Sequence, residues 1–542
     1  MNVAHAVGGA LVRCGIDSVF GVVGSGNFLV TNAMVAEGAR YVGARHEGGA
    51  ATMADAYARM SGSVAALSLH QGCGLTNALT GITEAAKSRT PLVVVTAEAT
   101  SRRSNFFVDQ AALAQAVGAV PMRVTSAEDA VGLAAAAVVT ARDDRRVVVL
   151  NLPLDVQGLE TPAAEPPTVH PRPAIAPDPA EVERLADALR SARRPVFVAG
   201  RGSRGPGSRA ALEELADRCG ALLATSAVAK GLFRGNPWDL DVSGGFATPL
   251  AAELVSGADL VVGWGCALNM WTMRHGRLIA DDAVVVQVDV DREAFGAHRD
   301  IAFGVLGDVR AVARAATAAL AESVGYRTPQ VRRGIAERGR WRDEPFEEAG
   351  RAGVIDPRTL TIGLDDLLPA ERVVAVDSGN FMGYPSMFLE VPDEYGFCFT
   401  QAFQSVGLGL ATAIGAALAR PDRLPVAALG DGGALMGASE LETVVRLGLP
   451  MVVVVYDDAA YGAEVHHFGP DGHRLDTVRF PETDFAAVAR GYGFEAVTVR
   501  DVADLKGVAG WLAGPRAAPL LIDAKVTRDE PSWWLGEAFR GH

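Results

Sequence analysis

The sequence predicts an α/β protein built from three doubly wound domains, each with a parallel sheet. Short runs rich in Val, Ala and Leu alternate with helical patterns along the whole chain of 542 residues. These runs are almost continuously apolar, which indicates strands covered on both faces and therefore a parallel sheet. Two loose segments, 161–179 and 325–353, separate three blocks, so we expect domains at 1–165, 180–325 and 353–542.

The first loose segment is dense in proline, which prevents a regular helix and predicts an extended linker. The second is rich in Arg and Glu and is expected to be partly helical. In the middle block we expect a helix at Pro179–Ser191 and strands at Pro195–Ala199 and Val284–Val290. The strands expected in the outer blocks are Tyr41–Arg45, Val64–His70, Pro91–Ala97, Arg372–Asp377, Val426–Gly430 and Met451–Tyr456. Open parallel sheets bind ligands beyond the carboxyl ends of their strands, so functional motifs should follow these runs.

Composition excludes several classes of protein. The net charge of −14 disfavours nucleic acid or an acidic membrane surface as a partner. No apolar run reaches the ~20 residues of a membrane span, and the N-terminal segment lacks the basic region of a signal peptide. The five cysteines are scattered without zinc-binding spacing, which fits a reducing compartment. We therefore expect an acidic cytoplasmic enzyme.

The strongest local motif is Gly430-Asp431-Gly432-Gly433, which follows a predicted strand and precedes a helix expected to begin near Gly437. Glycines let the backbone approach a ligand closely, and an aspartate supplies oxygen to a hard divalent cation. The next predicted strand, Met451–Tyr456, leads into Asp458, which lies 27 residues after Asp431. Because adjacent parallel strands end at the same edge, we expect both carboxylates to bind one Mg²⁺ beside a diphosphate.

The run from Gly430 to Gly462 resembles the cofactor motif of thiamine diphosphate-dependent enzymes, in which GDG is followed by an Asn-Asn pair. The resemblance implies metal ligation by Asp431, Asp458 and the backbone carbonyl of Ala460. Here Asp457-Asp458 replaces Asn-Asn, which adds negative charge near the diphosphate and puts the strength of cofactor binding in question.

Two further segments of the third block match the same family. Ser378-Gly379-Asn380, after a predicted strand, resembles the loop that cups the diphosphate, and Tyr461 closes the metal motif. Gln404-Ser405-Val406-Gly407 occupies the place of a Gly-Ser/Thr-Met-Gly segment. The resemblance implies that Gln404 offers its backbone carbonyl to the aminopyrimidine. It also implies that Val406 is the apolar wedge that bends the cofactor.

In the first block, His46-Glu47 ends a predicted strand and opens a helix rich in small residues. The segment RHEGGAATMADAYAR resembles the catalytic-glutamate segment of the family. The resemblance implies that Glu47 contacts N1′ of the aminopyrimidine and starts the proton relay that activates the cofactor. It also implies a homodimer or homotetramer, because Glu47 of one subunit would serve the cofactor held by another.

Three other segments of the first block are expected on the substrate side. Ser25 and Asn27 follow a strand and can hydrogen-bond a carboxylate or carbonyl. His70, with Ser25 and Glu47, resembles the Ser, Glu and His set of benzoylformate decarboxylase, so we expect it to relay protons. Gln110 lies in a segment that resembles the active-site glutamine segment of benzaldehyde lyase and acetolactate synthase.

The middle block is expected to be architectural. Acetolactate synthases carry FAD and an Arg-Phe-Asp-Asp-Arg segment in this domain, but the corresponding stretch here is 266–275, CALNMWTMRH, which disfavours FAD. The motif GRGS at 200–203 is a weak nucleotide signal by itself. The C-terminal segment 531–542 is expected either to fold over the cleft or to pack on an adjacent domain.

These residues favour decarboxylation of a pyruvate-like 2-oxo acid, with transfer of the resulting acyl unit to a carbonyl acceptor, as in acetolactate synthase. One alternative is a simple decarboxylase that releases an aldehyde, with His70 as the acid. Another alternative is a non-catalytic homologue, which the replacement of Asn-Asn by Asp457-Asp458 suggests. The presence of Glu47 and of the intact Gly-Asp-Gly disfavours this alternative.

Overall fold

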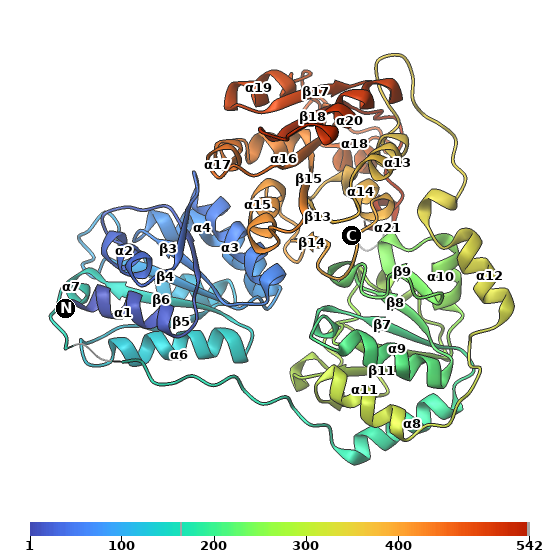
Figure 1. The fold of residues 1–542 in the computed structure, drawn as a ribbon, viewed down its shortest axis with the longest axis horizontal. Helices are drawn as coiled ribbons and strands as arrows, with labels where there is room; N and C mark the ends of the chain where they lie inside the picture. The colour runs from blue at the N-terminus through green and yellow to red at the C-terminus, as the bar shows by residue number, and fades with distance from the viewer. Residues whose placement is uncertain (163–164, 539–542) are drawn as a thin grey trace.

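The computed structural model describes residues 1–162 and 165–538. It contains three α/β domains, each built on a six-stranded sheet in which all strand pairs are parallel (Figure 1). The predicted fold class is therefore confirmed. Residues 165–178 form an extended segment on the way from the first domain (blue) to the middle domain (green), as their prolines predict, and helix α8 begins at Pro179.

The first sheet has the order β2-β1-β3-β4-β6-β5, with helices on both faces. Its four inner strands are almost entirely buried, which explains their apolar sequences, whereas the two edge strands are partly exposed. The elements are α1 (Val3–Arg13), β1 (Ser18–Gly21), α2 (Phe28–Ala36), β2 (Arg40–Gly43), α3 (Glu47–Ser61), β3 (Ala65–Leu69), α4 (Cys73–Lys87), β4 (Leu92–Glu98), α5 (Gln110–Ala116), β5 (Val120–Arg123), α6 (Ala130–Asp143), β6 (Val147–Pro153) and α7 (Leu154–Gln157).

The middle sheet has the order β12-β11-β10-β7-β8-β9, in which the winding direction reverses between β7 and β10. At that reversal the loops after the two strands are in close backbone contact. A Cβ added at Gly202 would lie only 2.7 Å from Gly265 Cα. The elements are α8 (Pro179–Ser191), β7 (Pro195–Ala199), α9 (Ser208–Cys219), β8 (Leu222–Thr225), β9 (Asp239–Val242), α10 (Pro249–Ser256), β10 (Leu260–Trp264), β11 (Val284–Asp289), β12 (Phe303–Leu306) and α11 (Val309–Ala318). The segment that follows contains α12 (Pro329–Arg338), as its composition predicts.

The third sheet, β14-β13-β15-β16-β18-β17, repeats the strand order of the first. Its elements are α13 (Pro357–Leu367), β13 (Arg372–Val376), α14 (Gly383–Phe388), β14 (Phe397–Phe399), α15 (Gly409–Ala419), β15 (Leu424–Gly430), α16 (Asp431–Met436), α17 (Glu440–Arg446), β16 (Val452–Asp457), α18 (Gly462–Phe468), α19 (Phe485–Tyr492), β17 (Glu495–Val499), α20 (Leu505–Ala513), β18 (Leu520–Lys525) and α21 (Leu535–Ala538).

The predicted strands and the first helix of the middle domain are confirmed with shifts of at most two residues at their ends. The helix expected near Gly437 begins three residues later, as α17 at Glu440, and the motif itself forms a separate short helix, α16, that was not expected. The chain leaves β15 through extended Gly430 and becomes helical at once at Asp431, and Gly437 ends this helix instead of beginning one. The glycines of the motif therefore serve close packing within a helix rather than an open turn.

A buried ionic network joins the first domain to the third. Arg59, at the end of α3, donates to Asp55 (2.6 Å), to Glu84 (2.8 Å) and to the carbonyl of Phe399 (2.8 Å). Glu84 in turn accepts from the backbone N–H groups of Ala402 (3.1 Å) and Phe403 (2.6 Å). The network thus fixes the chain that leaves β14, immediately before Gln404 and Val406.

We expect Arg59→Met to lower the free energy of unfolding by about 3–5 kcal/mol, because it leaves two buried carboxylates without their cation. Urea unfolding followed by circular dichroism measures the change. Arg40→Met, at an exposed arginine of the same domain, is the control and should change stability by about 0.5 kcal/mol or less. Equal stabilities of the two variants would contradict a structural role for the network.

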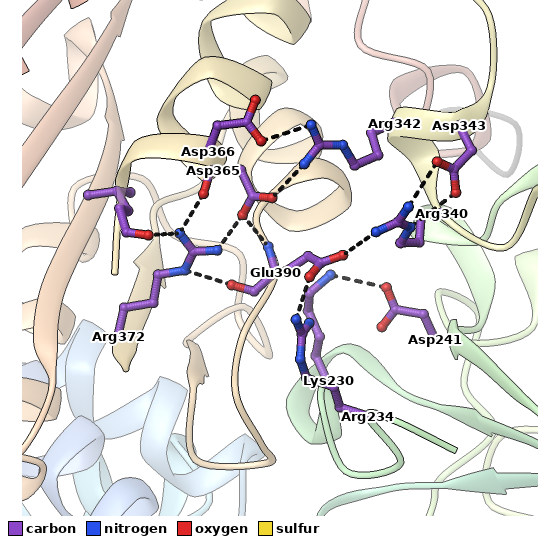
Figure 2. Close-up of polar contacts among 11 residues, drawn as sticks. Lys230, Arg234, Asp241, Arg340, Arg342, Asp343, Asp365, Asp366, Arg372 and Glu390 are labelled. Atoms are coloured by element: carbon purple, nitrogen blue, oxygen red, sulfur yellow. Dashed lines mark hydrogen bonds and ion pairs between the residues drawn. The ribbon is translucent and has the colours of Figure 1, made fainter. Parts of the chain in front are cut away.

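A second network joins the middle domain to the third (Figure 2). Glu390 lies between Arg234 of the middle domain and Arg340 of the connecting segment and forms ion pairs with both. Lys230, which is buried, donates to the carbonyl of Ser386 (2.8 Å) and pairs with Asp241 (3.3 Å). All three domains are therefore held in one arrangement within the chain.

The described part of the C-terminal segment packs on neighbouring domains. Trp534 contacts Trp271 and Phe246 of the middle domain, and its indole N–H donates to the carbonyl of Asn380 (3.0 Å). This agrees with the second of the two expected positions, while residues 539–542 lie outside the described part. Within residues 1–162 and 165–538, no helix is both long enough and apolar enough to cross a membrane.

Candidate active site

The carboxyl ends of β13, β15 and β16 bring the predicted third-domain residues together. These strands are neighbours in the sheet, and register pairs Val376 with Ala428 and Gly430 with Tyr456. The loops that follow all three strands therefore start at one edge. The cluster at this edge comprises Asp377, Ser378, Gly379, Asn380, Val406, Gly430, Asp431, Gly432, Gly433, Asp458, Ala460 and Tyr461.

Asp431 and Asp458 form a pair of carboxylates at this edge. Burial, together with the charge of Asp457, raises the pKa of Asp431 to about 7. Burial, together with the charge of Asp431, raises the pKa of Asp458 to about 8. The backbone N–H of Ala460 donates to Asp458 Oδ1 (3.1 Å), and its hydrogen bonding also counters the rise at Asp431. Both carboxylates thus converge on the backbone of Ala460.

This pair fits a divalent cation. Among the described residues, neither carboxylate has an ion-pair partner. No three His, Cys, Asp or Glu side chains in this part of the chain are placed to hold a metal ion by themselves. Two carboxylates and a backbone carbonyl leave coordination positions that a diphosphate and water can fill. A divalent cation would stabilise two like charges in such a buried site.

Asp457, the extra acid of the motif, is directed away from this pair. Its carboxylate lies 2.5 Å from Nζ of Lys525 on β18 and also accepts from the backbone N–H of Ala459 (3.0 Å). The negative charge that the sequence adds beside the diphosphate therefore has a counter-charge within the fold.

Asp377 organises the loops around the wedge position. Its buried carboxylate accepts from the backbone N–H groups of Ser378 (2.8 Å), Gly407 (3.0 Å) and Leu408 (3.2 Å). Burial nevertheless raises its pKa to about 6. Val406, just before Gly407, is 38 % exposed and lies against Gly433, where an added Cβ would be 3.4 Å from Val406 Cγ1. An exposed valine held on the glycine motif can press on a bound ligand.

The backbone at Gln404 has a positive φ of 60°, which is uncommon for a residue with a side chain. Its side chain is exposed. The conformation turns the chain between the residues that Glu84 holds and the residues that Asp377 holds. The carbonyl group of Gln404 is therefore set by anchors in two domains.

Asn380 and Tyr461 pack against two glycines, Gly462 and Gly432, that lie close in sequence to Asp458 and Asp431. Asn380 Nδ2 would lie 3.3 Å from a Cβ at Gly462, and Tyr461 Cε1 would lie 2.5 Å from a Cβ at Gly432. Asn380 Oδ1 accepts from the backbone N–H of Ser532 (3.0 Å), so part of its side chain is held by the C-terminal segment. Gly379, with φ of 141°, supplies the turn before it.

In the first domain, Glu47 is the first residue of α3 and is partly buried. Its Oε2 accepts from the side chain of Asn77 (3.0 Å) on α4. The preceding residues are fixed by Glu440 of α17, which accepts from the backbone N–H groups of Arg45 (3.0 Å) and His46 (3.1 Å). Within the described residues of one chain, no hydrogen bond joins Glu47 to the third-domain cluster.

His70 lies near Glu47 and beside the loop of Ser25. A Cβ added at Gly74 would contact both His70 Cβ (3.2 Å) and Glu47 Oε1 (3.8 Å), and one at Gly24 would clash with the imidazole ring. His70 Nδ1 lies 3.0 Å from the carbonyl of Gln71, which can only accept, so Nδ1 carries the hydrogen. Ser25 is exposed. The structure thus brings Ser25, Glu47 and His70 to one region.

Asn27 and Gln110 are placed differently from the prediction. Asn27 is fully buried, and its amide bonds the backbone of Gly24 (2.8 Å) and Ser68 Oγ (3.1 Å). Gln110 is 1 % exposed, and its amide bonds Gly72 N (2.9 Å), Ala97 O (3.1 Å) and Asn151 Oδ1 (2.8 Å). Both amides are hydrogen-bonded within the fold, so these residues hold the loops of Ser25 and His70 in place.

Three residues position the site through contacts that the sequence does not predict. Asp377 opens the segment that resembles the diphosphate loop, but its hydrogen bonds to Gly407 and Leu408 depend on tertiary structure. Glu84 and Glu440 had no signal, because each lies in an amphipathic helix where a surface glutamate is the ordinary expectation.

Comparison with known proteins identifies the family. Models of the thiamine pyrophosphate enzyme N-terminal TPP binding domain, central domain and C-terminal TPP binding domain match residues 1–122, 182–316 and 377–524. The chain is 28 % identical to a sulfoacetaldehyde acetyltransferase of Rhodobacter capsulatus, over all of this chain and 96 % of that protein. It is 28 % identical to an acetolactate synthase large subunit of Parasynechococcus marenigrum, over 97 % of this chain and 88 % of that protein.

A probable 2-ketoarginine decarboxylase of Pseudomonas aeruginosa is 30 % identical, over 92 % of this chain and 90 % of that protein. The relatives thus include both transferases and decarboxylases. Since the three domain models match in order along three parallel α/β domains, the chain belongs to the thiamine pyrophosphate enzyme family.

Proposed function

We propose that this protein is a thiamine diphosphate-dependent carboligase. It decarboxylates a pyruvate-like 2-oxo acid and transfers the acyl unit to a carbonyl acceptor. The observation that carries the proposal is the cluster at the third sheet edge, where exposed Val406 lies on Gly433 beside the Asp431–Asp458 pair. When bound, thiamine diphosphate supplies the carbon nucleophile that attacks the 2-oxo acid and holds the electron pair released with CO₂.

The third domain would hold the cofactor and its metal. Asp431, Asp458 and the carbonyl of Ala460 bind Mg²⁺, and Ser378, Gly379 and Asn380 lie around the diphosphate. The glycines Gly430, Gly432 and Gly433, with Tyr461, let the backbone come close to it. The carbonyl of Gln404 accepts from the aminopyrimidine, and Val406 presses the cofactor into a bent shape.

Glu47 would contact N1′ of the cofactor's aminopyrimidine and start the proton relay that activates the cofactor. Because no hydrogen bond joins Glu47 to the third-domain cluster within the described residues of one chain, we infer that a second copy completes each site, in a homodimer or homotetramer. In the middle domain, Gly202 and Gly265 are in direct contact where the winding direction of the sheet reverses, between β7 and β10. This contact supports a domain without FAD. We place the enzyme in the cytoplasm.

His70 can move protons in either reaction. Its Nδ1 is held by the carbonyl of Gln71, which leaves Nε2 for exchange with a bound intermediate. Ligation and aldehyde release both need one proton donated and one proton removed from a hydroxyl group, so His70 can serve either outcome. The likeness to the probable 2-ketoarginine decarboxylase supports a simple decarboxylase as the second function, and a non-catalytic homologue is the third.

Product analysis separates these functions. We expect purified protein with thiamine diphosphate, Mg²⁺ and pyruvate to release CO₂, and to form a C–C-coupled hydroxyketone when an acceptor aldehyde or a second 2-oxo acid is added. Mass spectrometry with ¹³C-labelled pyruvate measures the incorporated unit. Release of free acetaldehyde without any coupled product would establish the decarboxylase instead. Absence of cofactor-dependent CO₂ release from a panel of 2-oxo acids would favour the non-catalytic homologue.

A further inference from the structure

A buried ion-pair group lies directly beside the proposed metal site. Lys525, at the end of β18, donates to Asp457 (2.5 Å) and to the carbonyl of Thr483 (2.6 Å), and its Nζ lies 2.9 Å from Asp523. The three charged side chains are each 5 % exposed or less. The ammonium group thus has three oxygens within 2.9 Å, and Oε1 of the more exposed Glu482 lies 3.6 Å away. Because Lys525, Asp457 and Asp523 are almost inaccessible to water, the interactions among them are weakly screened.

Strand register explains why these side chains meet. Asp457 and Lys525 are partners in the parallel pair β16–β18, and Asp523, two residues before Lys525, points to the same face. On the other side of β16, Gly430 pairs with Tyr456, so Asp431 comes level with Asp457. Asp457 therefore stands between a proposed metal ligand on one neighbouring strand and a lysine on the other.

Asp457 also shapes the turn that carries the other two proposed ligands. Its Oδ1 accepts from the backbone N–H of Ala459, whose φ of 54° is strained for a residue with a side chain. Asp458 and Ala460 flank this residue. A displaced Asp457 would release the turn, and with it the carboxylate of Asp458 and the carbonyl of Ala460.

Charge gives the second consequence. Asp431, Asp457, Asp458 and Asp523 place four carboxylates at one sheet edge, and Lys525 is the ammonium group among them. Without it, the unpaired charge of Asp457 would act through a poorly solvated region on the proposed site of the anionic diphosphate. The acid at position 457 is thus compatible with an anionic cofactor only when its charge is neutralised.

We propose that Lys525 is a positioning residue for the metal and cofactor site, acting through Asp457 as its counter-charge and as the anchor of the Ala459 turn. This inference rests on the proposed ligands Asp431, Asp458 and Ala460. It explains how the chain carries Asp at the position where the cofactor motif has Asn. Lysine and aspartate act as a unit, so removing both charges should be better tolerated than removing the lysine alone.

The test compares Lys525→Met, Asp457→Asn and the double variant Asp457→Asn/Lys525→Met in the full-length protein. Thiamine diphosphate is titrated into cofactor-free protein in the presence of Mg²⁺, with tryptophan fluorescence as the readout and circular dichroism as the measure of folding. We expect Lys525→Met to raise the Kd by about 10- to 100-fold and the double variant to return it to within about threefold of the wild-type value. Lys506→Met, at an exposed lysine of α20, is the matched control and should leave the Kd unchanged.

Two results would overturn the proposal. One is a folded Lys525→Met variant with the wild-type Kd, and the other is a double variant that binds as weakly as Lys525→Met. If Lys525→Met does not fold, the double variant decides: folding and binding support the proposal, and failure to fold assigns Lys525 to the core instead. Failure of the wild-type protein to bind the cofactor in a Mg²⁺-dependent manner would refute the proposed metal site itself, which is a separate result.

Discussion

Replacement of Glu47 by Gln is expected to lower kcat for CO₂ release from a 2-oxo acid by about 10²–10⁴-fold, while thiamine diphosphate still binds. Gln keeps the size of the side chain and can still accept from Asn77, so the start of α3 should not change. It cannot exchange a proton with a ring nitrogen, and the relay that activates the cofactor is lost. Steady-state CO₂ release and a cofactor titration measure the two halves of the prediction.

Glu128→Gln, at an exposed glutamate of the same domain, is the control and should leave both quantities unchanged. Proton exchange at thiazolium C2, followed by NMR after acid quench, gives a readout independent of substrate identity. The assignment of Glu47 fails if the variant exchanges this proton and turns over at the wild-type rate. A loss of cofactor affinity equal to the loss of turnover would instead give Glu47 a role in binding.

The sequence was sufficient to predict the fold because its signals are local and repeated. Eight of the predicted elements, such as Pro195–Ala199 and Arg372–Asp377, are apolar runs of strand length bounded by turns or helix starts, and the structure has strands at each. Parallel pairing then follows from burial on both faces. The start of α16 escaped prediction because a glycine motif looks like a turn, although here Gly430 alone provides the turn.

The proximity of Asp431 and Asp458 was predictable, because each follows one of two neighbouring parallel strands. The site was not predictable where a polar side chain has a choice of partners. Asn27 and Gln110 are chemically suited to a substrate, and only tertiary contacts show that their amides are bonded within the fold. The pairing of Asp457 with Lys525 spans 68 residues and depends on strand register, which spacing along the chain does not give.

Replacement of Asp431 by Ala is expected to weaken Mg²⁺-dependent binding of thiamine diphosphate by at least about 100-fold, because it removes one of two carboxylates that converge on Ala460. The same change should stabilise the metal-free protein at pH 8. The pKa of Asp431 is raised to about 7 in the folded protein, against about 3.9 in an unfolded chain. A raised carboxyl pKa favours the folded state only while the group is protonated, so its contribution is lost as the pH rises through 7.

Thermal unfolding at pH 5 and pH 8, with and without Mg²⁺ and cofactor, tests both parts. Wild-type protein without metal should lose stability between these pH values and regain it on addition of Mg²⁺ and cofactor. Asp431→Ala should lose less stability between the two pH values, melt about 2–4 °C above the wild type at pH 8 without metal, and gain no stability from Mg²⁺ and cofactor.

Asp471→Asn, at an exposed acid of the same domain, is the control and should behave as the wild type. An Asp431→Ala variant that is stabilised by Mg²⁺ and cofactor as strongly as the wild type would show that the metal binds elsewhere. The sign of the pH effect therefore separates a carboxylate kept for metal binding, at a cost in stability, from one that stabilises the fold.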